Sequence, residues 1–290
     1  MKDFMPIGDW ITAIVNFLLN NFQPLFDGID AAIGGVTNSL EFVLLALPWW
    51  LLGLILILLG LWRVGWKFAV FVFISVLVIV GMGLWDETAV TLGLVIGATL
   101  VALLIGIPLG IWAARNDRVE TVVRTILDFM QTMPAFVYLI PAAMFFGLGK
   151  VPGTIATVIF AMPPAVRLTN LGIRQVRKEM VEAGLAFGCT DTQLLFKVQI
   201  PNALPSIMAG INQTIMLALS MVVIASMIGA GGLGNEVLRG IQRLDVGLGF
   251  EGGLGVVLLA IILDRITESF GKRQETSLVD QLRGLFGKRD

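Results

Sequence analysis

The sequence predicts an all-α membrane protein, and two observations lead to this prediction. Hydrophobic residues make up 57% of the 290 residues and charged residues only 14%, which is far from the composition of a soluble domain. Uncharged apolar runs also recur at about the twenty-residue length that a helix needs to cross a bilayer. A charge at the centre of such a helix costs roughly 2.5–3.5 kcal/mol, so runs of this kind are a selective signal. We therefore expect about seven transmembrane helices.

The expected transmembrane helices follow one another along the chain. Their ranges are residues 42–62, 68–85, 88–114, 129–147, 154–166, 203–228 and 252–266. The third range holds two Gly-x-x-x-Gly pairs, Gly93 with Gly97 and Gly106 with Gly110, which favour close helix packing. Residues 42–270 then form a transmembrane domain, and residues 271–290 form a charged tail.

Residues 1–41 are expected to form a separate amphipathic segment. Within them, Trp10, Ile14 and Leu18 recur at helical spacing, with Asn16 and Asn20 on the opposite side. This pattern is typical of a helix that lies in the membrane interface. A helix packed against the transmembrane helices fits the pattern equally well.

The distribution of lysine and arginine predicts the orientation in the membrane. With the N-terminus outside, sixteen of these residues fall on the inner side and four on the outer side, namely Lys2, Lys150, Arg239 and Arg243. Positive residues concentrate on the cytoplasmic side of membrane proteins. We therefore expect the N-terminus outside, the C-terminus in the cytoplasm, and residues 173–202 as a cytoplasmic loop.

The residue types in the chain exclude several classes of function. The chain has no histidine and a single cysteine, Cys189, which removes the commonest metal ligand and general base and rules out an internal disulfide. It has no GxxxxGK[ST] phosphate-binding loop, so it is not itself an ATPase. An ion-coupled secondary transporter would carry ionisable residues in mid-membrane and often inverted repeats, and we find neither. We expect no catalytic residue, no metal site, no bound cofactor and no nucleic-acid partner.

A polar stretch of about twenty residues lies between two apolar runs, at residues 182–201. Glu182, Ala183 and Gly184 lie at a predicted helix end, Gly188 follows after three residues, and Pro201 closes the stretch. Small side chains allow another protein to approach the backbone closely. The stretch resembles the cytoplasmic EAA loop of binding-protein-dependent ABC importers, whose order is Glu-Ala-Ala, three residues, Gly, nine residues and Ile-x-Leu-Pro. The resemblance implies a coupling helix that docks on a separate ATPase, and the coupling residues it points to are Glu182, Ala183, Gly184, Gly188, Asp191 and Pro201.

Three further stretches of sequence indicate which group of these importers the chain resembles. Residues 128–141, 162–175 and 212–222 look like the permease subunit of glycine betaine/proline betaine importers, and the resemblance extends over roughly residues 42–270. It implies the fold of a type I ABC importer permease, in a prokaryotic cell membrane, that moves compatible solutes for osmoprotection. The implied partners are an ATPase subunit that carries Mg-ATP, an extracytoplasmic substrate-binding protein, a second permease copy and membrane lipid. Choline, carnitine or an amino acid such as methionine remain alternative substrates.

The middle of the membrane is where we expect the solute to pass. Prolines there free backbone carbonyls, which are tolerated only where they are buried in protein or line a wet cavity. A quaternary ammonium cannot donate an N–H hydrogen bond, so aromatic faces and carbonyl dipoles suit it best. Each candidate fits a packing role as well, and the candidates are Met133, Pro134, Phe136, Tyr138, Pro163, Pro164, Asn212, Met216 and Ser220.

The loop expected at residues 229–251 lies on the outer side and is rich in glycine. We expect it to form an outer gate or a dock for the binding protein, or else only a short interfacial loop. The residues proposed for this role are Gly231, Gly232, Glu236 and Arg239.

Overall fold

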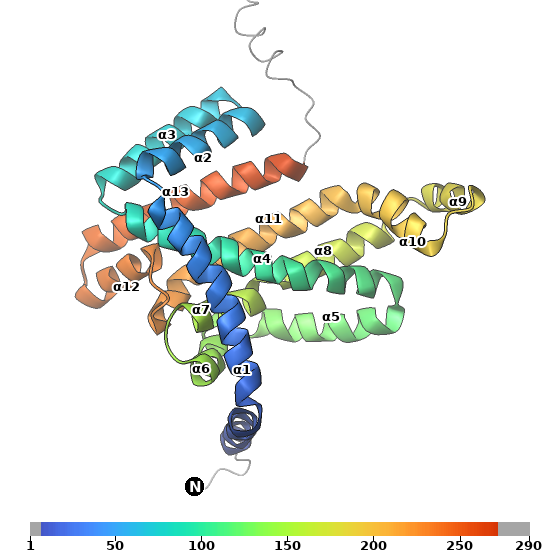
Figure 1. Ribbon diagram of the computed structural model, residues 1–290, viewed down its shortest axis with the longest axis horizontal. Coiled ribbons are helices and arrows are strands. Elements are labelled where there is room, and N and C mark those ends of the chain that lie inside the picture. Colours follow the sequence, from blue (N-terminus) through green and yellow to red (C-terminus); the bar gives the residue numbers. More distant parts are fainter. Residues whose placement is uncertain (1–6, 272–290) are drawn as a thin grey trace, which may run out of the picture.

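The computed structural model describes residues 7–271, and every regular element in that range is helical, as the sequence predicts. Lys2 and the predicted tail from residue 272 onward lie outside the described residues. A π-helical turn (Leu195–Gln199) precedes α11, and a 3-10 turn (Ser226–Ile228) follows it. The helices labelled in Figure 1 are α1 (Ile7–Ala46), α2 (Trp49–Arg63), α3 (Trp66–Gly81), α4 (Trp85–Arg115), α5 (Asp117–Thr132), α6 (Ala135–Phe146), α7 (Lys150–Ala161), α8 (Pro163–Arg174), α9 (Lys178–Ala186), α10 (Asp191–Leu194), α11 (Ile200–Ala225), α12 (Leu233–Arg243) and α13 (Val246–Gly271).

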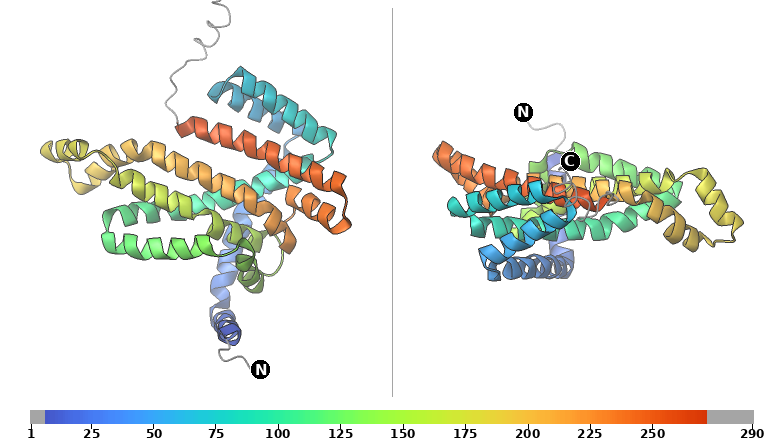
Figure 2. Two further views of the ribbon diagram at one scale, coloured as in Figure 1. Left: turned by 180° about the vertical axis from the view of Figure 1, so that it is seen from behind. Right: turned by 90° about the horizontal axis from the view of Figure 1, so that it is seen from above.

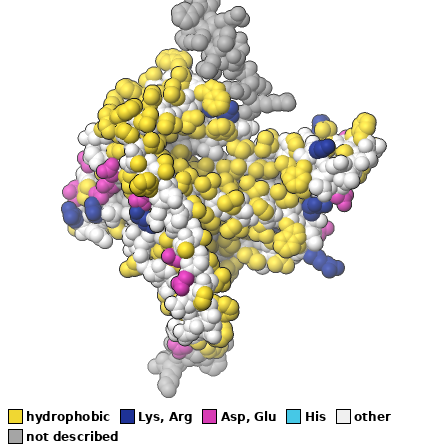
Figure 3. Space-filling view, viewed as in Figure 1, with side chains coloured by type: hydrophobic (Ala, Val, Ile, Leu, Met, Phe, Trp, Pro, Cys, Tyr) yellow, Lys and Arg dark blue, Asp and Glu magenta, His cyan; other side chains and the backbone are white. Residues whose placement is uncertain are grey.

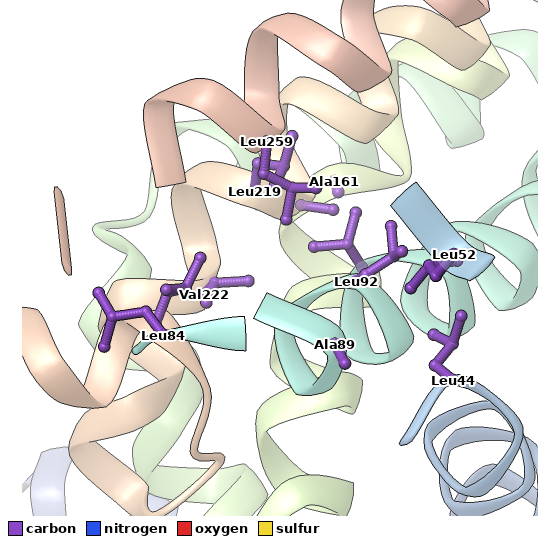
Figure 4. Close-up of a cluster of buried hydrophobic side chains, with 12 residues drawn as sticks. Leu44, Leu52, Leu84, Ala89, Leu92, Ala161, Leu219, Val222 and Leu259 are labelled. Atoms are coloured by element: carbon purple, nitrogen blue, oxygen red, sulfur yellow. The ribbon is translucent and has the colours of Figure 1, made fainter. Parts of the chain in front are cut away.

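The centre of the molecule is built from long helices. Helices α4, α11 and α13 run along its long axis, and α8 packs against both α4 and α11 (Figures 1 and 2). Leu92 of α4, Leu219 of α11 and Leu259 of α13 belong to one buried cluster (Figure 4). Because lipid tails are as apolar as these side chains, it is close packing that holds such helices together in a membrane.

The glycines of α4 bring other helices close to its backbone. A Cβ atom at Gly110 would lie 2.7 Å from the carbonyl oxygen of Val166 in α8, and one at Gly97 would lie 3.1 Å from the methyl group of Thr37 in α1. One predicted Gly-x-x-x-Gly pair therefore packs on α8 and the other on α1. This confirms that both pairs serve helix packing.

By length and composition, five helical segments among residues 7–271 could cross a membrane, or six if the bent pair of α5 and α6 counts as one. Helices α2 and α3 are apolar but have only 15 and 16 residues. At 1.5 Å per residue they measure about 22–24 Å, which is less than the roughly 30 Å of a bilayer core. A multi-span helical protein is therefore confirmed, whereas the count of seven stays a prediction.

Helix α1 is longer than the predicted N-terminal segment, because it runs through the expected boundary at residue 41 to Ala46. Its helical geometry breaks at Phe22 (φ −121°, ψ 19°), two residues before Pro24. Its later part crosses α4 at a steep angle (Figures 1 and 2), and the Lys150 ammonium of α7 lies 2.6 and 2.5 Å from the two carboxylate oxygens of Glu41. Pro48, with an extended backbone (φ −56°, ψ 144°), separates α1 from α2. The predicted helix at residues 42–62 is therefore divided between the two.

Two proline sites have different effects on the helices around them. At Met133 and Pro134 the axes of α5 and α6 turn by 99°, so residues 129–147 do not form the straight helix expected there. A proline disfavours the α conformation in the residue before it, and Met133 is extended (φ −72°, ψ 134°). Pro163 and Pro164 instead start α8, where a missing N–H costs little, and α7 and α8 together form one spanning segment (Lys150–Arg174).

The prediction of a loop at residues 229–251 is wrong for most of that range. Gly229, Gly231 and Gly232 do form a turn with positive φ, but α12 follows immediately and α13 begins at Val246. The hydroxyl oxygen of Thr91 in α4 accepts the N–H of Leu233 at 2.8 Å, which satisfies one of the free donors at the start of α12. Tertiary contacts of this kind override the loop-like composition.

Candidate functional site

The stretch at residues 182–201 projects from one end of the molecule as α9 and α10 (Figure 1). Helix α9 ends at Ala186, and Gly188, two residues later, has a φ of +78°. The Gly188 N–H donates to the Leu185 carbonyl at 2.9 Å, and the Cys189 N–H donates to the Gly184 carbonyl at 3.1 Å. This hydrogen-bond pair is a Schellman cap, which requires a left-handed residue at the position of Gly188. Gly188 is therefore needed for its backbone conformation.

Gly184 faces the second half of the same stretch. A Cβ atom there would lie 2.8 Å from Leu194 and 3.4 Å from Val198. Helix α10 begins with a capping box, in which the Thr190 N–H donates to the Gln193 side chain at 3.0 Å and the Gln193 N–H donates back to the Thr190 hydroxyl at 3.4 Å. Residues 182–201 thus fold into one compact, tightly turned unit.

Pro201 joins this unit to the transmembrane helix α11. Proline cannot donate the hydrogen bond that a regular helix requires. The chain instead forms the π-helical turn before it, in which the Ile200 N–H donates to the Leu195 carbonyl. A continuous helical segment therefore runs from Asp191 to Ile228.

The outer face of this unit combines charge with exposed apolar side chains. Glu182, Ala183 and Asp191 are exposed, as predicted for docking residues, whereas Gly184 is buried inside the unit. Leu185 and Phe196 are also exposed, and Phe187 is 89% exposed. Sequence analysis missed these three side chains, because apolar residues outside a membrane-spanning run are ordinarily expected to be buried. An apolar patch at the end of a projecting unit is suited to protein contact.

The residues predicted for the solute path are divided between buried and exposed positions. Tyr138 is buried, its hydroxyl donates to the Met130 carbonyl, and it packs in a cluster with Met133 and Met221. Pro163 and Pro164 are also buried. Of the nine predicted residues, the exposed ones in the described chain are Pro134, Phe136, Met216 and Ser220.

Asn212 is half-buried on α11, one and two helical turns before the exposed residues Met216 and Ser220. Its amide donates to the carboxylate of Asp264 in α13 at 2.8 Å. A hydrogen bond to a charged partner in this position ties two transmembrane helices together. Asn212 is therefore placed to hold α11 against α13.

The predicted outer gate is also divided between buried and exposed residues. A Cβ atom at Gly232 would lie 2.5 Å from the Thr91 hydroxyl, and the Glu236 side chain is buried and accepts a hydrogen bond from Arg239 at 2.7 Å. Gly231 is half-buried and Arg239 is exposed. The large apolar side chains exposed at this end, which sequence analysis missed, are Ile241, Leu244, Val246 and Phe250.

Charged side chains lie toward the ends of the molecule. In Figure 3 hydrophobic side chains cover the middle of the visible face, and Lys and Arg side chains lie at both ends, including the end where α4 meets α5 and where α9 projects. Among residues 7–271, no three His, Cys, Asp or Glu side chains lie close enough together to hold a metal ion.

Comparison with known protein families identifies the chain. Residues 106–276 match the family described as "binding-protein-dependent transport system inner membrane component". The chain belongs to this family. It is a multi-pass membrane protein, and its transport-family membership agrees with the EAA-like stretch that precedes Pro201.

Relatives of this transport component are similar over most of their length. The chain is 48% identical over 272 residues to the glycine betaine/proline betaine transport system permease protein ProW of Escherichia coli, covering 93% of this chain and 77% of that one. It is 50% identical to the glycine betaine/carnitine transport permease protein GbuB of Listeria monocytogenes, covering 94% of this chain and 98% of that one. It is 46% identical to the glycine betaine transport system permease protein OpuAB of Bacillus subtilis, covering 94% and 96%.

A solved structure shows that the transport component has a known fold. The MetNI methionine ABC transporter in an inward-facing conformation contains a chain that superposes with a TM-score of 0.56 at 22% identity. The match covers 63% of this chain and 94% of that chain. At this identity the likeness shows the fold alone, which is that of a type I ABC importer permease.

Proposed function

We propose that this chain is the transmembrane subunit of an ATP-driven importer for glycine betaine and related compatible solutes. The observation that carries the proposal is the projecting unit at residues 182–201, which pairs the EAA-like spacing with an exposed docking face. ATP is hydrolysed by a separate ATPase subunit, and the solute is delivered by an extracytoplasmic binding protein. The family description names such a binding protein, and relatives at 46–50% identity supply the substrate class.

The transmission of movement follows from how the docking unit is connected. Helix α9 follows α8 after a short turn, and α10 continues through the π-helical turn into α11. Because Gly184 packs directly against Leu194, the unit moves as one body when the ATPase displaces it. Helices α8 and α11 pack closely on one another, so both tilt together. Two permease copies, each docked on one ATPase, then alternate between inward-open and outward-open states, and each ligand shifts that equilibrium only through its different affinity for the two states.

We propose seven transmembrane segments with the N-terminus outside and the C-terminus in the cytoplasm. The segments are α2, α3, α4, the bent pair α5 with α6, the pair α7 with α8, α11, and α13. The short helices α2 and α3 are accommodated by local thinning of the bilayer and by flanking aromatic and basic side chains. Helix α1 lies across the outer half of the bundle, which its steep angle to α4 favours (Figure 1). The lysine and arginine count of the sequence supports this orientation.

The experiment that tests the proposal is uptake of labelled glycine betaine into proteoliposomes that hold this chain, its ATPase and its binding protein. We expect uptake to require ATP strictly and to be blocked by excess unlabelled glycine betaine. Uptake by this chain alone, driven by an ion gradient, would overturn the proposal. ATP-dependent assembly without betaine uptake would retain the importer and reject the substrate.

Carnitine is the second candidate substrate. The relative at 50% identity is named for both glycine betaine and carnitine, and the two solutes share a trimethylammonium group and a carboxylate. Competition between the two for ATP-driven uptake separates them. Inhibition by carnitine at concentrations similar to those of glycine betaine would place both within the substrate range.

A further inference from the structure

Two polar stripes face one another across a groove between α5 and α8. On α5 the stripe recurs at intervals of three or four residues through Asp117, Glu120, Arg124 and Asp128, and on α8 through Arg167, Asn170 and Arg174. Residues at these intervals share one face of a helix. The opposite face of α5 is apolar, with Val122 and Ile126 exposed. The sequence of α5 thus directs its charges toward α8 and its apolar face away from it.

The charges of the two stripes form pairs across the groove. Arg167 donates to the carboxylate of Asp128, and the Arg174 guanidinium lies 2.8 Å from the carboxylate of Asp117. Arg174 also donates to the side-chain oxygen of Asn170 at 3.0 Å and to the Ala113 carbonyl at 2.8 Å. Arg174 is thereby fixed by several partners, whereas its neighbour Arg167 is held by the Asp128 pair.

The stripes line a cavity of about 270 Å³, which has apolar walls between the charges. Arg167 of α8 and Asp128 of α5 both line it, and their charged groups are in direct contact with each other. The apolar walls come from both helices, and they are Val123, Leu127, Val166 and Leu171. Positive and negative groups therefore alternate with surfaces that accept methyl groups.

The Arg167–Asp128 pair lies deep along both helices. Asp128 is eleven residues from the first residue of α5, and Arg167 is seven residues from the last residue of α8. At 1.5 Å per residue these separations are about 16 and 10 Å from the end where the docking unit projects. The two side chains are nevertheless 59% and 42% exposed in the isolated chain. Charges at such depth are not left in contact with hydrocarbon, so this face is turned toward water or toward other protein.

We propose that this cavity is a transit site for a compact zwitterion, in which Arg167 binds its carboxylate and Asp128 attracts its quaternary ammonium. The inference rests on the proposed function and places the solute at named residues. When no solute is present, Arg167 and Asp128 pair with each other. When the solute binds, its carboxylate replaces Asp128 as the partner of Arg167, and its ammonium replaces Arg167 as the partner of Asp128. Because an exposed ion pair is weakly held, the exchange is readily reversible, as release on the inner side requires. The methyl groups of the solute then contact Val123, Leu127 and Leu171.

A zwitterion fits this cavity better than a simple anion or cation does. Opposite charges lie in pairs, so a ligand with one charge would leave one member of the Arg167–Asp128 pair without a partner. The unpaired member then loses the attraction that an oppositely charged group supplies. Because Arg167 and Asp128 are in direct contact, a ligand that engages both must carry its two charges a short distance apart, as in a betaine.

The test measures binding of three ligands of nearly equal shape to the nucleotide-free complex of this chain and its ATPase in lipid nanodiscs, without binding protein. Glycine betaine carries both charges, 3,3-dimethylbutanoate replaces its nitrogen by carbon and keeps only the carboxylate, and choline keeps only the ammonium. We expect Asp128→Asn to lower the ratio of glycine betaine to 3,3-dimethylbutanoate affinity about tenfold, because only glycine betaine uses the Asp128 carboxylate. Arg167→Gln is expected to lower the affinity for both carboxylate ligands about tenfold relative to that for choline. Arg118→Gln, also on α5 but outside the cavity, is the control and should change none of the three.

Several results would overturn the proposal. One is the absence of betaine binding by the wild-type complex when the same preparation, with binding protein and ATP, takes up glycine betaine. Another is a uniform loss of all three ligands in both variants, because this indicates a structural role. If Asp128→Asn fails to assemble, Asp128→Glu should assemble and retain the preference for glycine betaine, and loss of that preference would refute the site. Absence of ATP-driven uptake by the wild type would contradict the proposed function instead.

Discussion

Replacing Gly188 by alanine is expected to loosen the end of α9 without creating a clash. Gly188 has a φ of +78°, and among the described residues no atom lies within 4 Å of the position that a Cβ would take. The cost is therefore conformational, and a left-handed conformation costs an L-residue about 1–2 kcal/mol. A local change of this size increases the open population of the cap roughly 5- to 30-fold. Asparagine tolerates this conformation better than alanine, so Gly188→Asn should have a smaller effect.

Hydrogen–deuterium exchange measures this opening directly. The amides to follow are those of Phe187, Gly188 and Cys189, which donate within the cap. We expect them to exchange roughly 5- to 30-fold faster in Gly188→Ala than in the wild type, with Gly188→Asn between the two. Unchanged exchange in a well-expressed alanine variant would refute the left-handed cap. Loss of transport with unchanged exchange would show that the docking partner needs the open space at Gly188.

Three further changes test other parts of the structure. Phe187→Asp places a charge on the exposed docking face, so we expect normal folding but loss of ATPase co-purification; retained binding would exclude this face. Gly110→Leu forces a side chain against the backbone and side chains of α8, so it should lower the free energy of unfolding by about 1–3 kcal/mol. The measurement is the Tm in detergent, and a Tm equal to that of the wild type would contradict the packing of α4 on α8. Glu41→Gln leaves Lys150 without its charged partner and should cost roughly 1–3 kcal/mol by the same assay, and Lys150→Met together with Glu41→Gln should recover part of this loss.

The sequence by itself determined the class of the protein and the position of the unit at residues 182–201, for which we propose a docking role. Composition and uncharged apolar runs predict a multi-span helical protein, because a membrane interior excludes charge regardless of how helices are arranged. The spacing from Glu182 to Pro201 predicts the coupling stretch, because its helix end, its glycine and its proline are close in sequence and act locally. Local signals of this kind do not depend on the rest of the fold.

Only the tertiary structure decided which side chains face one another. As an aromatic residue in an apolar run, Tyr138 is predicted to lie on the solute path. In the structure its hydroxyl donates to the Met130 carbonyl, and its ring is buried in a cluster with Met221. Asp128 and Arg167 lie 39 positions apart and at the margins of predicted helices, so no local pattern unites them. They meet because α5 and α8 present matching faces of one groove. The packing of helices on one another depends on contacts between residues that are distant in sequence. Periodicity and motif spacing describe only residues that are close in sequence, so they do not predict these contacts.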